Sequence, residues 1–266
     1  YSGTAWSDSI FRRPCVMDDE ALLRFCCQIL LPEFGIAGQE RLSECCVVII
    51  GLGGLGSAAA LYLAAAGVGK LVLLDDDTVD LSNLQRQIVH DADRIGSSKV
   101  LSARDRLLAL NPACDVIAHP VRFAADQAGS WLSDADLVLD CCDNFATRFA
   151  LNQACFRTRT PLVSGAALGW SGQVCVFLYQ PGQACYRCLF EDHAEPAATC
   201  SESGIMAPVV GVIGSLQALE ALKILSQVGE TLHSRLLLFD GLGQHWRTLQ
   251  VQPDPACPIC SLSDSI

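Results

Sequence analysis

The residues Gly51-Leu52-Gly53-Gly54-Leu55-Gly56 stand between the apolar run 47–50 and the alanine-rich stretch 57–66. They satisfy the pattern G-x-G-x-x-G, in which glycines permit a tight turn and a close approach of the backbone to a phosphate. A helix that begins here offers unpaired N–H groups and the positive end of its dipole to an anion. Asp75 ends the next apolar run, 71–74, where its carboxylate can accept a hydrogen bond from a ribose hydroxyl. The stretch therefore predicts a nucleotide-binding strand, turn and helix. The motif alone favours NAD, and a glycine-rich turn without a ligand is the alternative.

Outward from this motif, short apolar runs alternate with segments that fit helices. We expect strands at 47–50, 71–74, 114–119, 137–139 and 162–163, and helices at 18–31, 57–66, 97–110, about 124–132, 144–157 and 209–225. This alternation predicts an α/β fold of the Rossmann type, with a doubly wound, mostly parallel sheet. Strands at 173–179, 235–240 and 245–251 should extend it in antiparallel fashion. We expect residues 1–17 to be an N-terminal extension and 18–266 to be a single domain.

The composition excludes several classes of protein. Of the 266 residues, 51% are hydrophobic and 18% are charged, which indicates a globular chain with a sizeable core. The net charge of −11 argues against nucleic acid and anionic membrane surfaces as partners, because both require a basic face. We see no apolar run of the roughly 18 residues that a membrane-spanning helix needs and no export signal. We therefore expect a cytoplasmic protein that binds neither nucleic acid nor membrane.

Four of the fifteen cysteines form two C-x-x-C pairs, Cys185/Cys188 and Cys257/Cys260. Each pair can bind one metal ion through two thiolates, and two pairs complete a tetrahedral shell of four sulfurs. Such a shell leaves no open coordination position, so we predict a structural Zn²⁺ site. Two unrelated turns or two redox pairs are the alternatives. Of the other cysteines we assign Cys141, Cys155 and Cys175 to the core, whereas Cys200 lies in a polar segment where a thiol can be exposed and reactive.

Charged and amide side chains gather after the second predicted strand. Asp75 is followed by Asp76 and Asp77, and then by Asn83, Arg86, Gln87 and Lys99. Two cations and an asparagine downstream of a nucleotide loop suit a triphosphate better than a pyrophosphate, because more negative charge must be neutralised. Asp143, after the run 137–139, is placed to hold Mg²⁺ near the phosphates. The residues therefore favour ATP with Mg²⁺.

These features resemble the ThiF/MoeB/HesA family of sulfur-carrier adenylyltransferases, which are relatives of the ubiquitin-activating enzymes. The resemblance runs from about Leu22 to Cys260. It is carried by the glycine loop 51–56, Leu81-Ser82-Asn83-Leu84-Gln85-Arg86-Gln87, Asp140-Cys141-Cys142-Asp143-Asn144, Cys185-Tyr186-Arg187-Cys188, Gly211-Val212-Ile213-Gly214-Ser215-Leu216-Gln217-Ala218 and Cys257-Pro258-Ile259-Cys260.

The resemblance implies ATP- and Mg²⁺-dependent adenylation of the C-terminal glycine of a ubiquitin-like sulfur carrier that ends in Gly-Gly. It implies a ribose contact for Asp75, phosphate contacts for Asn83, Arg86 and Lys99, and a place near the metal and α-phosphate for Asp143. The nucleotide-binding set that we expect is Gly51, Gly53, Gly54, Gly56, Asp75, Asp77, Asn83, Arg86, Gln87, Lys99 and Asp143. The catalytic set that we expect is Arg86, Lys99, Asp143 and Cys200.

The resemblance also implies partners. Cys200 corresponds to the cysteine that joins the carrier through a covalent sulfur linkage in some members. Family members are homodimers with one Zn²⁺ per chain. Because the sequence ends soon after Cys260, without the rhodanese domain of some relatives, we expect a separate sulfur-donor protein.

One position departs from the family pattern, which places Arg-aromatic-x-Arg-Gln near the N-terminus. The segment here is Arg24-Phe25-Cys26-Cys27-Gln28, so Cys27 stands where the second arginine belongs. Three readings stay open: an active adenylyltransferase with its cation elsewhere (Arg24 is one option), an impaired relative that only binds the carrier, or an NAD-dependent oxidoreductase. Within the first reading the stretch 199–218 resembles the molybdopterin-pathway members, whereas 238–241 and 246–247 resemble the thiamine-pathway members, and we favour the molybdopterin pathway slightly.

Overall fold

The computed structural model describes residues 17–190 and 204–261. Within these residues eight strands form one sheet in the order β3-β2-β1-β4-β5-β6-β7-β8. The strands are β1 Cys46–Ile50, β2 Lys70–Leu74, β3 Asp115–His119, β4 Leu137–Asp140, β5 Leu162–Leu168, β6 Ser171–Phe177, β7 Arg235–Asp240 and β8 His245–Gln250. The first five in spatial order are parallel, and β6, β7 and β8 continue the sheet as antiparallel neighbours. The predicted mostly parallel, antiparallel-extended sheet is therefore confirmed.

Alternating side chains of the central strands enter two separate cores. Val47 and Ile49 face one hydrophobic cluster, whereas Val48 and Ile50 face the other. A strand that is buried on both faces can be apolar at every position, which is why β1 reads as an uninterrupted hydrophobic run.

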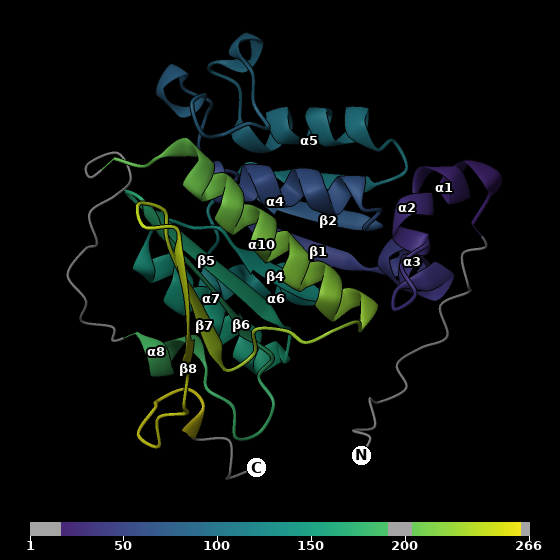
Figure 1. The fold of residues 1–266 in the computed structure, drawn as a ribbon. Coiled ribbons are helices and arrows are strands. Elements are labelled where there is room, and N and C mark those ends of the chain that lie inside the picture. The colour runs from purple at the N-terminus through teal and green to yellow at the C-terminus, as the bar shows by residue number, and fades with distance from the viewer. Residues whose placement is uncertain (1–16, 191–203, 262–266) are drawn as a thin grey trace.

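Helices cover both faces of this sheet (Figure 1). The first core receives side chains from α4 Gly54–Ala65, α5 Lys99–Leu110 and α10 Ala207–Ser226, and the second from α6 Ala128–Leu132 and α7 Phe145–Thr158. The remaining helices are α1 Asp19–Arg24, α2 Cys26–Ile29, α3 Gly35–Glu44 and α8 Tyr186–Leu189, with short 3₁₀ turns η1 Leu81–Asn83, η2 Ala92–Arg94 and η3 Ala125–Gln127. Helices on two faces of a parallel sheet make the fold doubly wound.

The predicted single helix at 18–31 is wrong. The chain forms α1 and α2 with a break at Phe25, whose ring is buried against Gly67 at a distance that leaves no room for a larger residue there. A further helix, α3, was not predicted. Its Gln39 is fully buried, and the cost of burying this polar side chain is offset because its amide donates to the carbonyl oxygen of Ala66 at 2.9 Å. A buried polar residue of this kind removes the apolar periodicity that reveals a helix.

Strands β5 and β6 differ from the predicted ones by two residues or more, whereas the other strands agree to within one residue at each end. Strand β5 extends to Leu168 through the small residues Gly165 and Ala166, which did not read as a strand. Gly165 is required there because a Cβ atom would lie 2.4 Å from the side chain of Gln217. Strand β6 ends at Phe177 rather than 179, since Tyr179 has a φ of 53°. The division into an extension at 1–17 and one domain at 18–266 stays a prediction, with residues 1–16 outside the described range.

Helix α10 corrects the expectation that no apolar stretch reaches membrane-spanning length. An 18-residue window of this 20-residue helix has a mean hydropathy of 1.5, which meets that criterion by length and composition. The helix packs tightly on the rest of the fold: a Cβ atom at Gly214 would lie 2.4 Å from the Leu55 carbonyl oxygen of α4. Burial inside the protein accounts for its apolar composition.

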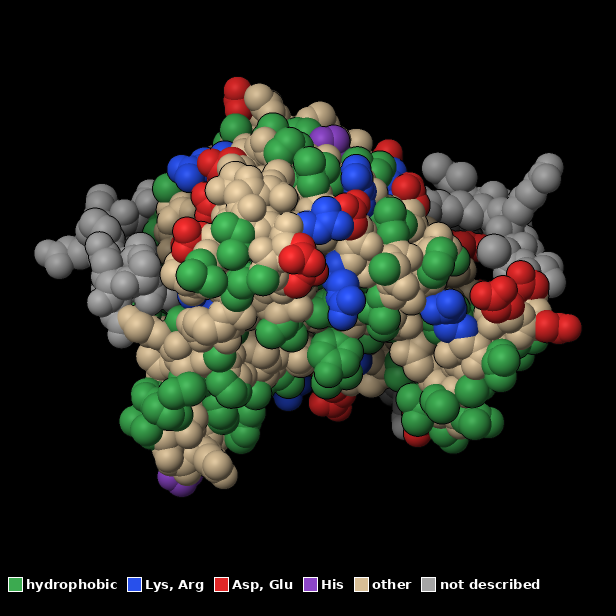
Figure 2. Space-filling view, turned by 90° about the horizontal axis from the view of Figure 1, so that it is seen from above, with side chains coloured by type: hydrophobic (Ala, Val, Ile, Leu, Met, Phe, Trp, Pro, Cys, Tyr) green, Lys and Arg blue, Asp and Glu red, His purple; other side chains and the backbone are tan. Residues whose placement is uncertain are grey.

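On the face seen in Figure 2, basic side chains lie among acidic ones rather than in one patch.

Candidate functional site

A large cavity opens at the carboxyl ends of the parallel strands, where the strand order reverses between β1 and β4. Its volume is about 1030 Å³. In open α/β sheets such a reversal point is where ligands bind. The lining includes, of the predicted nucleotide-binding set, Gly51, Gly53, Gly54, Asp75, Asp77, Asn83, Arg86, Gln87, Lys99 and Asp143. The structure therefore brings together residues that lie more than 90 positions apart in the sequence.

The glycine loop needs its glycines for three different reasons. Gly51 has a φ of +93°, and a Cβ atom there would lie 2.7 Å from the Cys141 carbonyl oxygen. At Gly56 a Cβ atom would lie 1.9 Å from the carbonyl oxygen of Gly51, and at Gly54 it would lie 2.7 Å from the side chain of Val210. At Gly53, by contrast, a Cβ atom would meet no clash, since its nearest neighbour would be the Gln87 amide nitrogen at 3.7 Å. Gly51, Gly54 and Gly56 therefore allow the tight turn and its packing on α10. Gly53 keeps the loop free of a side chain where it lines the cavity.

Asp75 braces this loop. Its carboxylate accepts hydrogen bonds from the backbone N–H of Leu52 at 2.6 Å and of Asp77 at 2.9 Å. Burial raises the pKa of the Asp75 carboxyl above its ordinary value, and these N–H groups together with the charge of Lys99 oppose that shift only in part. Each oxygen retains a lone pair beyond the bond it already accepts. The carboxylate can therefore brace the loop and still accept from a ribose hydroxyl.

Lys99 is the first residue of α5, and its side chain is only 7% exposed. Its ammonium group lies 2.9 Å from the carboxylate of Asp77. Asn83 has its amide oxygen engaged by the backbone N–H of Asp80, and Arg86 donates one guanidinium N–H to the carbonyl of Ser82 at 3.2 Å. The remaining N–H donors of these three side chains lie at the cavity wall, where an anionic ligand can accept hydrogen bonds from them.

Gln87 is 3% exposed, and its amide oxygen has no hydrogen-bond partner among the described residues. A buried, unpaired acceptor costs free energy unless a ligand or water satisfies it. Asp143 is exposed at the end of β4, next to Asn144, which caps α7 by accepting from the Thr147 N–H at 2.9 Å. The Gln87 amide oxygen and the Asp143 carboxylate are therefore both available to a ligand in the cavity.

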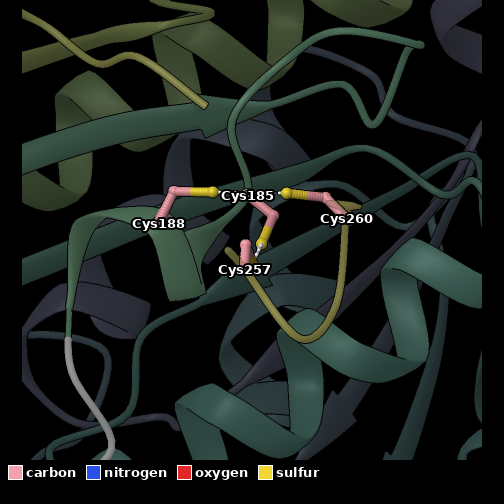
Figure 3. A group of neighbouring side chains, drawn as sticks. All are labelled: Cys185, Cys188, Cys257 and Cys260. Atoms are coloured by element: carbon pink, nitrogen blue, oxygen red, sulfur yellow. Dashed lines mark hydrogen bonds between the residues drawn. The ribbon is translucent and has the colours of Figure 1, made fainter. Parts of the chain in front are cut away.

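The four predicted metal-ligating cysteines converge (Figure 3). Their Sγ atoms all lie within 4.8 Å of one another, with Cys185 at 3.6 Å from Cys257 and Cys188 at 3.2 Å from Cys260. A tetrahedral ZnS₄ site with bonds of about 2.3 Å has sulfurs about 3.8 Å apart. Burial and the neighbouring Cys188 and Cys257 thiolates raise the pKa of the Cys185 thiol to about 12. The donor set fits Zn²⁺, because a cation would relieve this crowding of negative charge.

A model of the ThiF family matches residues 25–259. The chain belongs to the ThiF family. Within it, the chain is 48% identical over 246 residues to the molybdopterin-synthase adenylyltransferase of Escherichia coli K12, covering 92% of this chain and 98% of that protein. It is 46% identical over 249 residues to the sulfur carrier protein ThiS adenylyltransferase of the same organism, covering 94% and 99%. The crystal structure of PaaA matches with a TM-score of 0.78 at 21% identity, covering 94% of this chain and 79% of that one, which is a likeness of fold.

ThiF-family membership and the names of these two relatives do not support the NAD-dependent oxidoreductase reading. The glycine loop alone could not exclude it, because the same turn serves any dinucleotide or nucleotide whose phosphates meet a helix N-terminus. The resemblance to the ThiF/MoeB/HesA family is therefore confirmed.

Two buried charges, one lining the cavity of this ThiF-family site and one behind it, were missed by sequence reasoning. Arg148, on α7, donates to the carbonyl oxygens of Cys142 and of Gly165, the latter at 3.0 Å, and lies 3.9 Å from the Asp140 carboxylate. Asp140 is fully buried and accepts from the Ser164 hydroxyl at 2.6 Å. Asp140 is the first residue of the recognised segment 140–144 and Arg148 follows its end by four positions, and this position in the sequence was the available signal.

Further cations that sequence reasoning did not assign line the cavity. Arg122 follows β3 and contacts the Asp76 carboxylate at 3.2 Å, and Arg247 lies on β8. Cys27 is exposed on α2, and the described residues that line the cavity do not include it. Arg24 donates to the Leu110 carbonyl at 3.1 Å and lies 4.0 Å from Glu20.

The remaining cysteine predictions divide into tested and untested ones. Cys141, Cys155 and Cys175 are buried, as predicted. Burial raises the pKa of the Cys175 thiol to about 12, so this group stays protonated at neutral pH and is unsuited to catalysis. Cys200 lies outside the described residues, so its catalytic role stays a prediction.

Proposed function

We propose that this chain adenylates the C-terminal glycine of a ubiquitin-like sulfur-carrier protein. A carboxylate oxygen of the carrier attacks the α-phosphorus of ATP, an acyl-phosphate bond forms, and the bond to the β-phosphate breaks with release of pyrophosphate. The carrying observation is the cavity at the β1/β4 reversal point, where Lys99, Arg86 and the glycine loop meet Asp143. The adenylyltransferase names of relatives that match over nearly their whole length support the same reaction.

The size of the cavity supports two substrates rather than one. Pockets for small ligands usually measure about 300–1000 Å³. The volume of about 1030 Å³ lies just above that range, and strands β7 and β8 supply part of the wall. A nucleotide on the glycine loop would therefore leave room for the end of an extended peptide on the side of β5 to β8.

The chemistry requires charge neutralisation more than proton transfer. A C-terminal carboxylate is ionised at pH 7, so attack on the α-phosphate needs no general base. Lys99 and Arg86 would neutralise the phosphates, and Asp75 would accept from the ribose. Mg²⁺ is commonly held by one or two carboxylates together with substrate phosphates, a requirement that the exposed Asp143 carboxylate fits. The metal supplies further neutralisation of the triphosphate, and the protein supplies orientation.

The carrier and its pathway form the finer part of the proposal. Identities of 48% and 46% to the two named enzymes do not separate a molybdopterin-pathway carrier from a thiamine-pathway one, and we keep the preference for the former on the stretch 199–218. We further propose a homodimer, a cytoplasmic location, a separate sulfur-donor protein, a structural Zn²⁺ and a covalent role for Cys200. Cys27 would then be compensated by a cation such as Arg122 or Arg247 in the same chain.

The proposal is tested by incubating the chain with Mg·ATP and each candidate carrier and measuring the carrier's mass. We expect a carrier heavier by one adenylyl group and carrier-dependent exchange of pyrophosphate into ATP. Binding of carrier without exchange or adenylate would instead establish the binding-only alternative that Cys27 keeps open. Binding of NAD in preference to ATP would contradict both readings.

A further inference from the structure

His90 is a buried imidazole beside the glycine loop that neither the sequence reasoning nor the proposed reaction uses. It is 7% exposed. Its Nε2 atom lies 3.2 Å from the carbonyl oxygen of Leu52, inside the glycine loop, and its Nδ1 atom lies 2.9 Å from the hydroxyl of Ser102 on α5. Both ring nitrogens are therefore engaged, by two different structural elements.

The partners fix the protonation of the ring. A carbonyl oxygen only accepts, so Nε2 must carry the proton and donate to Leu52. Nδ1 then accepts from the Ser102 hydroxyl. Burial and the charge of Lys99 lower the pKa of His90, which agrees with a neutral ring at pH 7.

The backbone of Leu52 is thus held on both sides, at its N–H and at its carbonyl oxygen. Its N–H donates to Asp75 at 2.6 Å, and its carbonyl accepts from His90. The next two residues, Gly53 and Gly54, line the cavity. Because Leu52 is fully buried and its carbonyl has a fixed partner, the Gly53 N–H, which shares the planar peptide with that carbonyl, is oriented as well.

His90 also joins the elements that carry the predicted phosphate ligands. Its own N–H donates to the carbonyl of Gln87 at 3.1 Å, which ties it to the segment that bears Arg86. Ser102 lies one turn beyond Lys99 on α5. The His90 side chain therefore connects the glycine loop to the Lys99 helix, and its backbone N–H joins both to the Arg86 segment.

We propose that His90 is a positioning residue that sets the glycine loop for the phosphate chain of the nucleotide by holding the Leu52 carbonyl. This inference rests on the proposed function, because it assumes that the cavity binds a nucleoside triphosphate. The imidazole does not touch the phosphates. It acts through the Leu52 peptide unit.

Two variants separate this role from a purely structural one. Glutamine places an amide nitrogen near the Nε2 position and can still donate to Leu52, whereas asparagine reaches only the Nδ1 position beside Ser102. We would measure Mg·ATP binding by calorimetry and carrier-dependent exchange kinetics for His90→Gln and His90→Asn, with melting temperatures for both. His119→Asn is the matched control, because the His119 ring contacts the Trp131 ring in a tilted arrangement, with centroids 4.5 Å apart, and does not line the cavity.

We expect His90→Asn to weaken Mg·ATP binding and raise the KM for ATP roughly five- to tenfold, which corresponds to one lost hydrogen bond, with kcat changed less than about twofold. His90→Gln should weaken binding less than His90→Asn, and the control should bind as the wild type does. Equal weakening in both His90 variants, or a lowered melting temperature with unchanged binding, would overturn the proposal. If the wild type binds Mg·ATP but catalyses no exchange, the proposed reaction fails while calorimetry still decides the role of His90. If the wild type does not bind Mg·ATP, both are overturned.

Discussion

Loss of the metal from the four-cysteine site should destabilise the protein by an amount that the chain topology sets. The two cysteine pairs are joined by 72 residues, counted from Cys185 to Cys257. Treating the metal as a cross-link, the loop-closure relation for that length gives about 4 kcal/mol of stabilisation. For a domain of this size that corresponds to a decrease of the melting temperature on the order of 10 °C.

The variant that tests this is Cys257→Ser combined with Cys260→Ser. We would quantify bound zinc by mass spectrometry of the digested protein and record thermal unfolding with and without added chelator. The wild type should contain one zinc per chain and lose the expected stability on chelation. The double variant should contain none and should not respond to the chelator.

Cys114→Ala is the matched control, since this buried thiol, 3% exposed, lies outside the four-cysteine group. It should retain its zinc. Full zinc content in the double variant, or an unchanged melting temperature after zinc removal, would refute the cross-link reasoning.

Three further predictions concern the cavity and the core. Arg86→Ala or Asp143→Ala should abolish carrier-dependent pyrophosphate exchange, because each removes charge or metal ligation at the phosphates; wild-type rates in either variant would remove those roles. Gly56→Ala should prevent Mg·ATP binding, because the added Cβ would lie 1.9 Å from the Gly51 carbonyl oxygen and the loop must move, and unchanged affinity in a calorimetric titration would count against this packing. The pKa of the Cys175 thiol is raised from 9.0 to about 12, so its contribution to stability is complete below pH 9 and is lost as the pH rises towards 12. Cys175→Ala should therefore lose less stability than the wild type across that window in alkaline urea titrations, and parallel losses would contradict this assignment.

The sheet could be predicted from the sequence because its parallel strands are buried on both faces and read as apolar runs. The glycine loop and Asp75 could be placed because their spacing is local. The break at Phe25 and the helix α3 could not be predicted in the same way. They depend on contacts with Gly67 and Ala66, which lie on another part of the chain.

For a related reason, the polar residues at strand ends could be predicted as part of the site, whereas its buried charged and polar residues could not. Residues that meet a ligand lie in polar segments at strand ends and are visible in a sequence. Arg148, Asp140 and His90 are buried, and their value depends on partners that the fold brings to them from distant positions. A charged residue within a predicted helix reads as solvent-exposed until its burial is known.

Tyr186 carries a consequence for the handling of this protein. It stands between Cys185 and Cys188, its backbone N–H donates to the Asn152 side chain at 2.9 Å, and it is one of the residues that line the cavity. The Asn152 amide also lies 3.7 Å from the Cys185 sulfur. A strong chelator in the purification buffer that removes the proposed Zn²⁺ would therefore disturb the cavity lining at Tyr186 as well as lower the stability of the protein. Preparations of low turnover should have their zinc content checked before a sequence change is held responsible.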